Sequence, residues 1–410
     1  MSLKFFLLLF LPILLSASLT YTSNHNKEVS ILETFDIDQS FLYDPILNKM
    51  RNNNTTIYKD KRFFKPMDKA YLFIPAVKNI LAEYNVPAEF LFLAMAESNF
   101  STRAYSRKKA SGLWQFMPAT GKLYGLKINK YVDERRDFIK STRAAAKFLT
   151  HLHEKFGKWY LAAIAYNCGG GRLGKAIKRA GTDDLNVLLN KRKRYLPRES
   201  RLYIRKILAL ALMGNDEQLL LKSEYDHLLN RANAYSISTI KLPRGESLER
   251  VSKLIGIPKE ELKVLNRHLK YDFIPPYCKE YDIYIPYLKL SDFKQKYYKE
   301  NIRNIYKVHR VKRGDNLSII GHKYGVPYRV IMDFNKLKNS RLKLKQKLII
   351  PIGNKKKIKK INSKFYYNVK RGDTLESISK AHRVSIKNLK QQNHLKGSLI
   401  KIGERLKIYE

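Results

Sequence analysis

The chain has 410 residues, enough for two or three domains of roughly 150 residues each, and 44% of its residues are hydrophobic. Its 27 Tyr and 19 Phe residues argue against a largely disordered chain, and 19 Gly and 14 Pro are too few for a collagen-like or low-complexity protein. The two cysteines, Cys168 and Cys278, exclude a disulfide framework and a multi-cysteine zinc site. The formal net charge of +44 favours an anionic partner such as nucleic acid, an anionic membrane or an acidic cell-wall polymer, although compositional drift explains it equally well.

The first 18 residues have the pattern of a secretory signal peptide. Lys4 supplies the positive charge, residues 5–15 are apolar, and residues 16–18 are small. A helix that spans a bilayer needs about 20 residues, and this apolar run is shorter. No cysteine lies near the predicted cleavage site to carry a lipid. We therefore expect an exported protein without a transmembrane anchor after cleavage, at most peripherally associated with the envelope. Export argues against nucleic acid as the partner.

Residues 19–65 are polar and Asn-rich, which predicts an irregular extension or short helices. From residue 66 to about 222 the pattern is helical, with apolar residues at helical spacing in 70–83, 88–97, 141–156, 160–165 and 201–213. We expect one mainly helical domain over 66–222.

A single carboxylate in this domain has an unusual setting. Residues 90–96 contain no polar side chain, so their helix is predicted to be buried on all sides, and Glu97 stands at its carboxyl end. Desolvation and the negative end of the helix dipole would both raise the pKa of the Glu97 carboxyl. A carboxylic acid that stays protonated near neutral pH suits general-acid catalysis on a glycosidic oxygen. The alternative is a helix-end Glu that points into water.

Two further segments combine polar groups with glycines. Residues 111–121 join Trp114 and Gln115 to a proline and two glycines, and residues 165–172 end an apolar helix in a glycine-rich turn. This turn lacks the Lys-Ser/Thr of a phosphate-binding loop and follows no strand, so nucleotide binding is not expected. His151 and His153 stand two apart on a helix, which makes them a poor metal pair. We expect neither a metal nor a cofactor.

The carboxyl half contains three copies of one sequence motif, at residues 242–248, 311–317 and 369–375. Each copy is followed by a short helix, a turn, a second helix, an Asn-centred loop at Asn266, Asn335 or Asn393, and an apolar strand. Such self-similarity indicates small modules instead of one core. The basic stretches 294–299 and 354–360 are predicted to be flexible, solvated linkers.

Three short motifs of the helical region carry a family resemblance. Glu97-Ser98, the stretch from Gly112 to Gln115, and Ala165-Tyr166-Asn167 resemble the signature motifs of the family 1 lytic transglycosylases, which have a goose-lysozyme-like fold. The added stretch 133–137 and the trailing repeats look like the membrane-bound lytic murein transglycosylase D branch. The chain departs from the family pattern at Cys168, where alanine is usual, and in lacking the lipid-anchor cysteine of that branch.

This resemblance implies a bacterial lyase of the periplasm or cell envelope, acting as a monomer on peptidoglycan glycan strands. Glu97 would be the only catalytic acid and base, cleaving the β-1,4 bond between N-acetylmuramic acid and N-acetylglucosamine with formation of a 1,6-anhydro product. Asp133 and Asp137 would instead cap helices or pair with arginines. The substrate would contact a further set of residues, namely Ser98, Gln115, Phe116, Met117, Tyr166 and Asn167.

Each repeat resembles a LysM module, a small βααβ fold that binds N-acetylglucosamine-containing glycans. The match is good over 306–351 and 365–409 and poorer over 234–286, where Glu246 replaces the usual Asp and residues 275–278 form an insertion. The implied glycan-binding residues are Gly314, Asp315, Asn316, Leu317, Ile331 and Asn335 in the second module and Gly372, Asp373, Thr374, Leu375 and Asn393 in the third. Equally, the two aspartates could cap helices and the two asparagines could shape turns.

Three alternatives to a lytic transglycosylase remain open at this point. A lysozyme-like hydrolase would cleave the same bond with water, and a wall-binding protein would retain the fold without activity. A nucleic-acid binder driven by the positive charge is disfavoured by export and by the absence of a stacked-aromatic motif.

Overall fold

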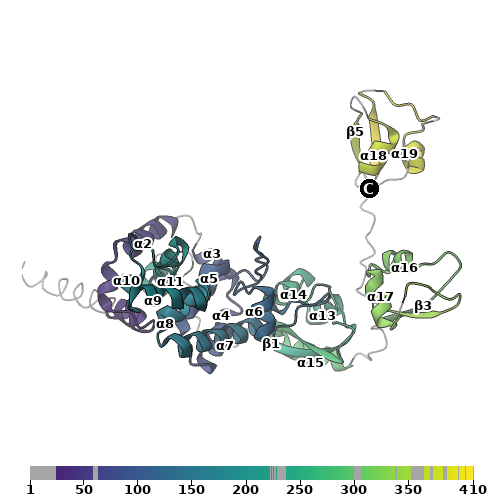
Figure 1. Ribbon diagram of the computed structural model, residues 1–410. Coiled ribbons are helices and arrows are strands. Elements are labelled where there is room, and N and C mark those ends of the chain that lie inside the picture. Colours follow the sequence, from purple (N-terminus) through teal and green to yellow (C-terminus); the bar gives the residue numbers. More distant parts are fainter. Residues whose placement is uncertain are drawn as a thin grey trace, which may run out of the picture.

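The structure is a computed structural model, and it describes residues 25–58, 63–221, 223, 225, 228, 237–299, 306–337, 339–351, 364–369, 373–381, 386–395, 397–401 and 403–409 (Figure 1). The predicted signal peptide at 1–18, the predicted linker at 354–360 and Gly372 lie outside these ranges.

The first part of the chain is helical, as its hydrophobic periodicity predicts. Pro75 lies in the first turn of its helix, and Gly157 and Gly181 end theirs in the left-handed conformation. The elements are η1 (Gln39–Tyr43), α2 (Pro45–Tyr58), α3 (Phe64–Lys69), α4 (Ile74–Glu83), η2 (Ala88–Phe90), α5 (Leu91–Ser98), α6 (Pro118–Leu123), η3 (Glu134–Arg136), α7 (Phe138–Phe156), α8 (Trp159–Cys168), α9 (Gly170–Ala180), α10 (Leu185–Leu188), α11 (Arg198–Gly214) and α12 (Glu217–Leu221).

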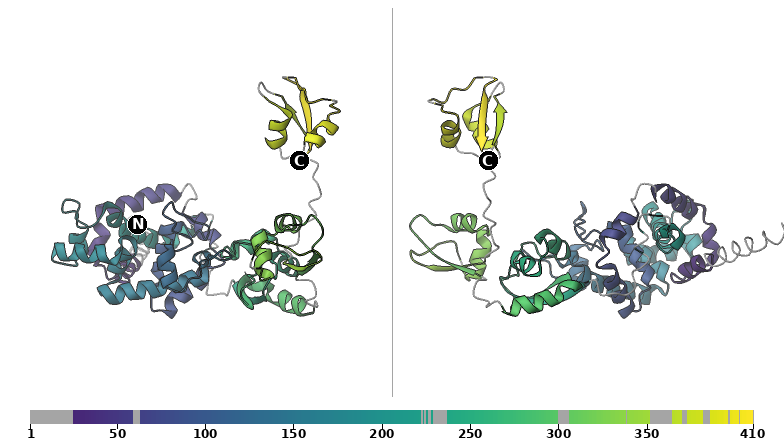
Figure 2. Two further views of the ribbon diagram at one scale, coloured as in Figure 1. Left: turned by 45° about the vertical axis from the view of Figure 1, so that its right-hand side comes forward. Right: turned by 180° about the vertical axis from the view of Figure 1, so that it is seen from behind.

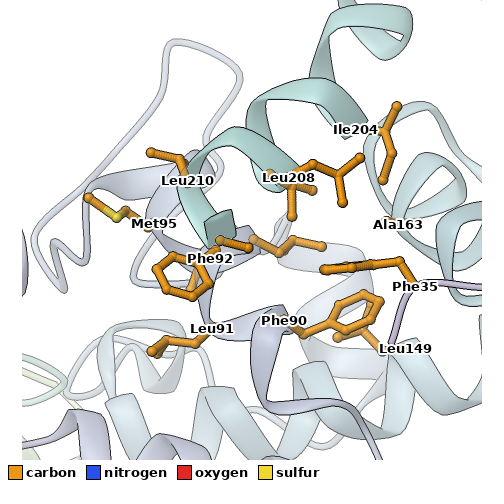
Figure 3. Close-up of a cluster of buried hydrophobic side chains, with 14 of the residues drawn as sticks. Phe35, Phe90, Leu91, Phe92, Met95, Leu149, Ala163, Ile204, Leu208 and Leu210 are labelled. Atoms are coloured by element: carbon orange, nitrogen blue, oxygen red, sulfur yellow. The ribbon is translucent and has the colours of Figure 1, made fainter. Parts of the chain in front are cut away.

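Helix α5 lies at the centre of the helical core. Its residues from Leu91 to Met95 are buried, as the all-apolar sequence predicts. Figure 3 shows Phe92 and Met95 of α5 beside Leu208 and Leu210 of α11, with Phe35 and Phe90 close by. The core therefore fixes α5, and with it the position of Glu97 at its carboxyl end.

The predicted amino-terminal extension is part of this core. Leu32 and Phe35 are fully buried in the same hydrophobic cluster as α5. The Asp44 carboxylate pairs with the Arg205 guanidinium of α11 at 2.7 Å, and both side chains are nearly buried. The helical domain consequently begins well before residue 66, and the boundary expected there is wrong. The Asn-rich composition of 51–54 hid the apolar positions that precede it.

The carboxyl half forms three βααβ modules, as the repeats predict. Each has one antiparallel pair of strands and two helices between them. The strands are β1 (Ile237–Pro243) with β2 (Glu280–Pro286), β3 (Tyr306–Arg310) with β4 (Lys347–Pro351), and β5 (Lys364–Asn368) with β6 (Arg405–Tyr409). The helices are α13 (Leu248–Ile255) and α14 (Lys259–Leu265), α16 (Leu317–Tyr324) and α17 (Tyr328–Phe334), and α18 (Leu375–Ala381) and α19 (Ile386–Gln392).

The repeated asparagine has the same structural task in all three modules. The Asn266 amide donates to the carbonyls of Leu262 and Tyr284 and accepts from the Tyr284 amide. Asn335 and Asn393 make the equivalent three bonds in their modules. Each asparagine thus joins the end of the second helix to the closing strand, which explains why it recurs at this position.

The predicted linker at 294–299 is wrong. These residues belong to α15 (Leu290–Lys299), which follows the short helix η5 (Tyr287–Lys289). Phe293 and Tyr297 stand one helical turn apart and are buried against the first module, and the Tyr297 hydroxyl donates to the Glu246 carboxylate at 2.9 Å. The lysines between them conceal this apolar pair in the sequence.

The first module is docked on the helical domain, as both views of Figure 2 show. The Asp133 amide donates to the His268 carbonyl, and the Lys270 amide donates to the Tyr131 carbonyl, both at 2.9 Å. Two buried tyrosines of the strand β2 add side-chain contacts: the Tyr281 hydroxyl donates to Glu134 at 2.6 Å, and the Tyr284 hydroxyl donates to Asp137 at 2.8 Å. The two parts therefore share a polar, buried interface.

In the described ranges, no helix combines the length and apolar character that a membrane crossing would need.

Replacing Tyr284 by Phe tests this interface. The change removes the hydroxyl that donates to the buried Asp137 carboxylate, and a buried charged acceptor that loses a partner costs about 1–3 kcal/mol. We expect Tyr284→Phe to lower the free energy of unfolding by that amount in denaturant titrations. Tyr43→Phe, at a side chain that is 75% exposed, is the matched control and should change nothing. Equal stability of both variants would contradict the assigned contact.

Candidate active site

The Glu97 carboxyl sits at the end of the buried helix α5, as predicted. The helix ends at Ser98, and Asn99 leaves it in the left-handed conformation, with φ at 50°. Glu97 is partly buried. Burial raises the pKa of its carboxyl above the ordinary value, against the lowering effects of a hydrogen bond from Tyr203 and the positive charge of Lys206. The surroundings therefore shift the Glu97 carboxyl towards its protonated form.

Tyr203 is a site residue that the sequence analysis missed. It lies on α11, is 8% exposed, and its hydroxyl donates to the Glu97 Oε1 at 2.5 Å. Burial and the nearby Glu97 raise the pKa of Tyr203 well above its usual value, so its hydroxyl stays protonated. In the sequence, Tyr203 occupies an apolar-face position within 201–213 and is indistinguishable there from a core tyrosine.

Lys206 lies one turn further along α11. Its Nζ donates to the Ala96 carbonyl at 2.6 Å, which places an ammonium group next to the end of α5. Burial lowers the pKa of Lys206, whereas the Glu97 carboxylate raises it. The Lys206 position thus brings a cation to the negative end of the α5 dipole.

The predicted motifs meet around Glu97 through hydrogen bonds to one loop. The Ser98 hydroxyl donates to the Leu113 carbonyl, and the Tyr166 hydroxyl donates to the Trp114 carbonyl, both at 2.7 Å. The Gln115 amide donates to the Gly112 carbonyl at 2.8 Å. The three segments singled out in the sequence thus form one structural unit, with α5 and α8 holding the loop between them.

The segment 133–137 supports this loop from behind. The Arg135 guanidinium is buried, pairs with Asp133 at 2.8 Å, and donates to the carbonyls of Lys109 at 2.7 Å and Phe116 at 3.0 Å. A Cβ atom on Gly112, whose φ is +82°, would lie 1.7 Å from the Arg135 carbonyl oxygen. Glycine is thus required here by both backbone conformation and space.

The acidic residues of this segment are engaged in structural contacts, as predicted for Asp133 and Asp137. The Asp133 carboxylate accepts from the Arg135 Nε at 2.9 Å. The Asp137 carboxylate caps α7 by accepting from the amides of Ile139 and Lys140.

Phe116 and Met117, both expected to line the groove, differ in their exposure to solvent. Phe116 is only 2% exposed and packs against the rings of Phe148 and Tyr166, so the expectation that it lines the groove is wrong. Its ring fills the space under the loop, as large aromatics usually do. Met117, the next residue, is 43% exposed.

Asn167 and Cys168 stand at the end of α8. The Asn167 side-chain oxygen accepts from the Ser200 hydroxyl of α11 at 2.7 Å. Burial raises the pKa of the Cys168 thiol, which disfavours the reactive thiolate. Cys168 therefore takes the place of a small apolar residue. Within the described ranges, no group of three or more His, Cys, Asp or Glu side chains is placed to hold a metal ion.

The residues predicted to bind glycan in the second module serve mainly its fold. Leu317 and Ile331 are buried in its core, so their expected place in a groove is wrong. Asp315 accepts from the Lys312 amide and contacts the His309 ring, whereas the cap of α16 is Asn316. Asn335 joins helix to strand as described above. Gly314 and Asn316 remain exposed.

The third module repeats this arrangement in its described part. Leu375 is buried, and the Asp373 carboxylate accepts from the Tyr367 hydroxyl at 2.8 Å. The Thr374 hydroxyl accepts from the Ser377 amide at the start of α18. Asn393 makes the helix-to-strand bonds described above. Among the described residues of this set, Thr374 is exposed. The expected groove place of Leu375 is therefore also wrong.

Comparison with known sequence families matches four stretches of the chain. Residues 75–188 match the Transglycosylase SLT domain, and residues 309–351 and 367–408 match the LysM domain. Residues 236–302 match the family described as Lytic transglycosylase MltD, LysM-like domain, and this range includes α15.

Among similar proteins, the Membrane-bound lytic murein transglycosylase D of Escherichia coli K12 is 30% identical over 344 residues, which cover 79% of this chain and 73% of that protein. The Peptidoglycan transglycosylase gp16 of Escherichia phage T7 is 42% identical over 84 residues, covering 20% of this chain and 6% of that protein. The crystal structure of the 70 kDa soluble lytic transglycosylase of Escherichia coli covers 36% of this chain and 25% of its own, with 20% identity and a TM-score of 0.28.

The identity and coverage of the first relative, with the three family matches in chain order, carry the assignment. The chain belongs to the family of the membrane-bound lytic murein transglycosylase D.

Proposed function

We propose that this protein is a peptidoglycan lytic transglycosylase in which Glu97 alone acts as catalytic acid and base. The observation that carries the proposal is the setting of that carboxyl: the end of a buried helix, a raised pKa, and a 2.5 Å hydrogen bond from Tyr203. The three motif segments converge on the same place. A raised carboxyl pKa keeps the proton available for transfer near neutral pH.

The reaction needs no second reactant. Protonated Glu97 gives its proton to the oxygen that links N-acetylmuramic acid to N-acetylglucosamine, and the bond from that oxygen to C1 breaks. The Glu97 carboxylate then takes the proton of the muramoyl C6 hydroxyl, whose oxygen bonds to C1. The product is a 1,6-anhydro sugar, and the carboxyl returns to its protonated state. Because no water enters, the enzyme is a lyase.

A second catalytic carboxylate is not part of the proposal. Glycosidases that use two carboxylates commonly hold them about 5–10 Å apart. The acidic residues singled out by the sequence, Asp133, Glu134 and Asp137, are bonded to arginine, lysine, tyrosine and backbone amides. The substrate's own acetamido group would instead stabilise the positive charge at C1, as the family resemblance implies.

The loop and α8 supply the groups that would contact sugar. Gln115 would bind hydroxyl or acetamido groups, and the exposed Met117 would lie along the glycan. Tyr166 and Asn167, fixed by Trp114 and Ser200, would orient the muramoyl ring. Ser98 would act indirectly, because its hydroxyl positions the loop at Leu113.

The second and third modules would tether the enzyme to glycan strands. Modules that bind weakly gain strength in series, because each raises the local concentration of the next. Their exposed residues Gly314, Asn316 and Thr374 are the remaining candidates for contact. Residues 1–18 fit a signal for export to the periplasm, where the enzyme would act as a monomer at the envelope.

The first module would not bind glycan in this way. Its loop after β1 carries Glu246, which is 1% exposed and bonded to Arg250 and Tyr297. The backbone of residues 272–274 covers the same loop, with the Leu248 amide donating to the Asp272 carbonyl. Residues 272–274 and Tyr297 therefore occupy the surface that a glycan would contact.

Replacing Glu97 by Gln tests the assigned acid. We expect turnover of purified sacculi to fall by about 100-fold or more, the usual contribution of a general acid, while binding to sacculi is retained. Mass spectrometry of the released muropeptides measures the first quantity and co-sedimentation the second. Glu83→Gln, at an exposed position on α4, is the control and should retain activity.

The same mass spectra separate this function from its alternatives. Wild-type products heavier by one water would indicate lysozyme-like hydrolysis. No product at all, with sacculus binding intact, would indicate an inactive wall-binding protein. Loss of binding together with activity in Glu97→Gln would contradict the division between the catalytic domain and the modules.

Replacing Tyr203 by Phe tests the partner of Glu97 through the pH profile. The Tyr203 hydroxyl stabilises the charged form of the carboxyl and so lowers its pKa; its removal raises that pKa further. Because the first step needs protonated Glu97, the alkaline limb of kcat/KM should move to higher pH, and the rate should fall about tenfold or more through lost orientation. An unshifted alkaline limb would contradict the assigned role of this hydrogen bond.

A further inference from the structure

A strongly cationic cavity lies in the helical domain, with a volume of about 1220 Å³. One wall is α9, which contributes Arg172 and Arg179, and another is the first turns of α11, which contribute Arg198 and Arg201. The loop between α10 and α11 adds three more basic side chains, and no acidic residue lines the cavity. Seven positive charges thus face one concave space.

These seven side chains have no acidic partner among the residues that the structure describes, since none of them lies within ion-pair distance of a carboxylate there. The buried arginines of the same domain differ, because Arg135 pairs with Asp133 and Arg205 with Asp44. Like charges in a concave site repel one another and focus a positive potential, which an anion would relieve.

Contacts within the protein shape this cavity. The Arg179 guanidinium lies 5.8 Å from the centre of the Tyr195 ring, a cation–π arrangement, and the Arg201 Nη1 donates to the Leu196 carbonyl at 3.1 Å. These contacts join α9 and α11 to the loop between α10 and α11, so the basic side chains project from walls with a defined geometry.

The cavity shares its walls with the candidate active site. Helix α11 gives Ser200 and Tyr203 to the site, where they bond to Asn167 and Glu97, and gives Arg198 and Arg201 to the cavity. On the other wall, α9 follows α8 after the single residue Gly169. A glycan held at Asn167 would therefore have its substituents near the basic side chains.

We propose that this cavity binds the carboxylates of the peptide stems that the muramic acid residues of the substrate carry. The inference rests on the proposed function, since it concerns the same substrate. The glycan backbone offers hydroxyl and acetamido groups, so the stems are the part of the strand that supplies carboxylates close to the cleaved bond. The arginine fork matches a carboxylate in geometry and charge. The cavity makes the enzyme prefer glycan that still bears its stems.

The test compares two substrates and two variants of equal charge. The substrates are sacculi with intact stems and glycan strands from which an amidase has removed the stems. Each stripped muramoyl residue keeps one lactyl carboxylate, attached next to the sugar ring, and loses the carboxylates of the stem. Arg172→Gln, Arg192→Gln and Arg198→Gln are combined in one variant, because all three side chains are exposed and line the cavity. The control combines Lys49→Gln, Arg143→Gln and Lys147→Gln, three exposed cations elsewhere in the same domain.

We expect the cavity variant to lose about tenfold in kcat/KM on stem-bearing substrate, equivalent to about 1.4 kcal/mol, and to match the wild type on stripped strands. The control variant should match the wild type on both. Circular dichroism and melting temperature check that both variants are folded.

Three outcomes would overturn the proposal. Equal loss on both substrates would assign the cavity to the glycan or to the fold, and no loss on either would leave the cavity without a role in substrate binding. If the cavity variant bound vesicles of anionic lipid more weakly than the wild type and kept the wild-type preference for stem-bearing substrate, the cavity would be assigned to lipid headgroups. If the wild type released no 1,6-anhydro product from either substrate, the proposed function itself would fail. That result differs from a failure of the cavity proposal, which appears only as a difference between the variants and the wild type.

Discussion

The buried guanidinium of Arg135 is the contact on which the geometry of the site depends. A buried charge is costly unless it is paired and its remaining donors are bonded. Arg135 meets this requirement with Asp133 and with the carbonyls of Lys109 and Phe116. The loop from Gly112 to Phe116 is therefore held in the one arrangement that satisfies the guanidinium. The same loop receives Ser98 and Tyr166, the neighbours of Glu97 in the site.

The first module extends this support beyond the helical domain. The backbone of His268 and the hydroxyls of Tyr281 and Tyr284 bond to the residues on either side of Arg135. The module is thus joined, through a buried interface, to the segment that positions the loop from Gly112 to Phe116. Its departures from the LysM pattern agree with this role: the backbone of residues 272–274 and the Tyr297 hydroxyl of α15 cover Glu246, whereas Gly314 and Asn316 of the equivalent loop in the second module are exposed. A LysM-like module is here packed against the helical domain as part of its support.

The sequence was sufficient where the signal was local. The apolar run 90–96 predicted a buried helix with Glu97 at its end, and the threefold repeat predicted three βααβ modules. Contacts between residues that are far apart in the chain produce no comparable pattern in the sequence. Tyr203 bonds to a residue 106 positions away, and on its own helix it resembles any core tyrosine. The helix α15 was missed because lysines surround Phe293 and Tyr297, so composition outweighed the apolar pair one turn apart.

The electrostatics of Glu97 combine opposing influences, which suit the two tasks that we propose for it. An acid with a very high pKa would hold its proton too firmly to give it up, and one with an ordinary pKa would be ionised before substrate arrives. Burial and Glu199 raise the pKa of the Glu97 carboxyl, while Tyr203 and Lys206 lower it. The net effect raises the pKa, which favours the protonated form that the proposed first step needs. In the proposed reaction, the carboxylate left behind would keep the Tyr203 hydroxyl as its hydrogen-bond donor until the C6 proton arrives. These opposing influences agree with our proposal that one residue serves first as acid and then as base.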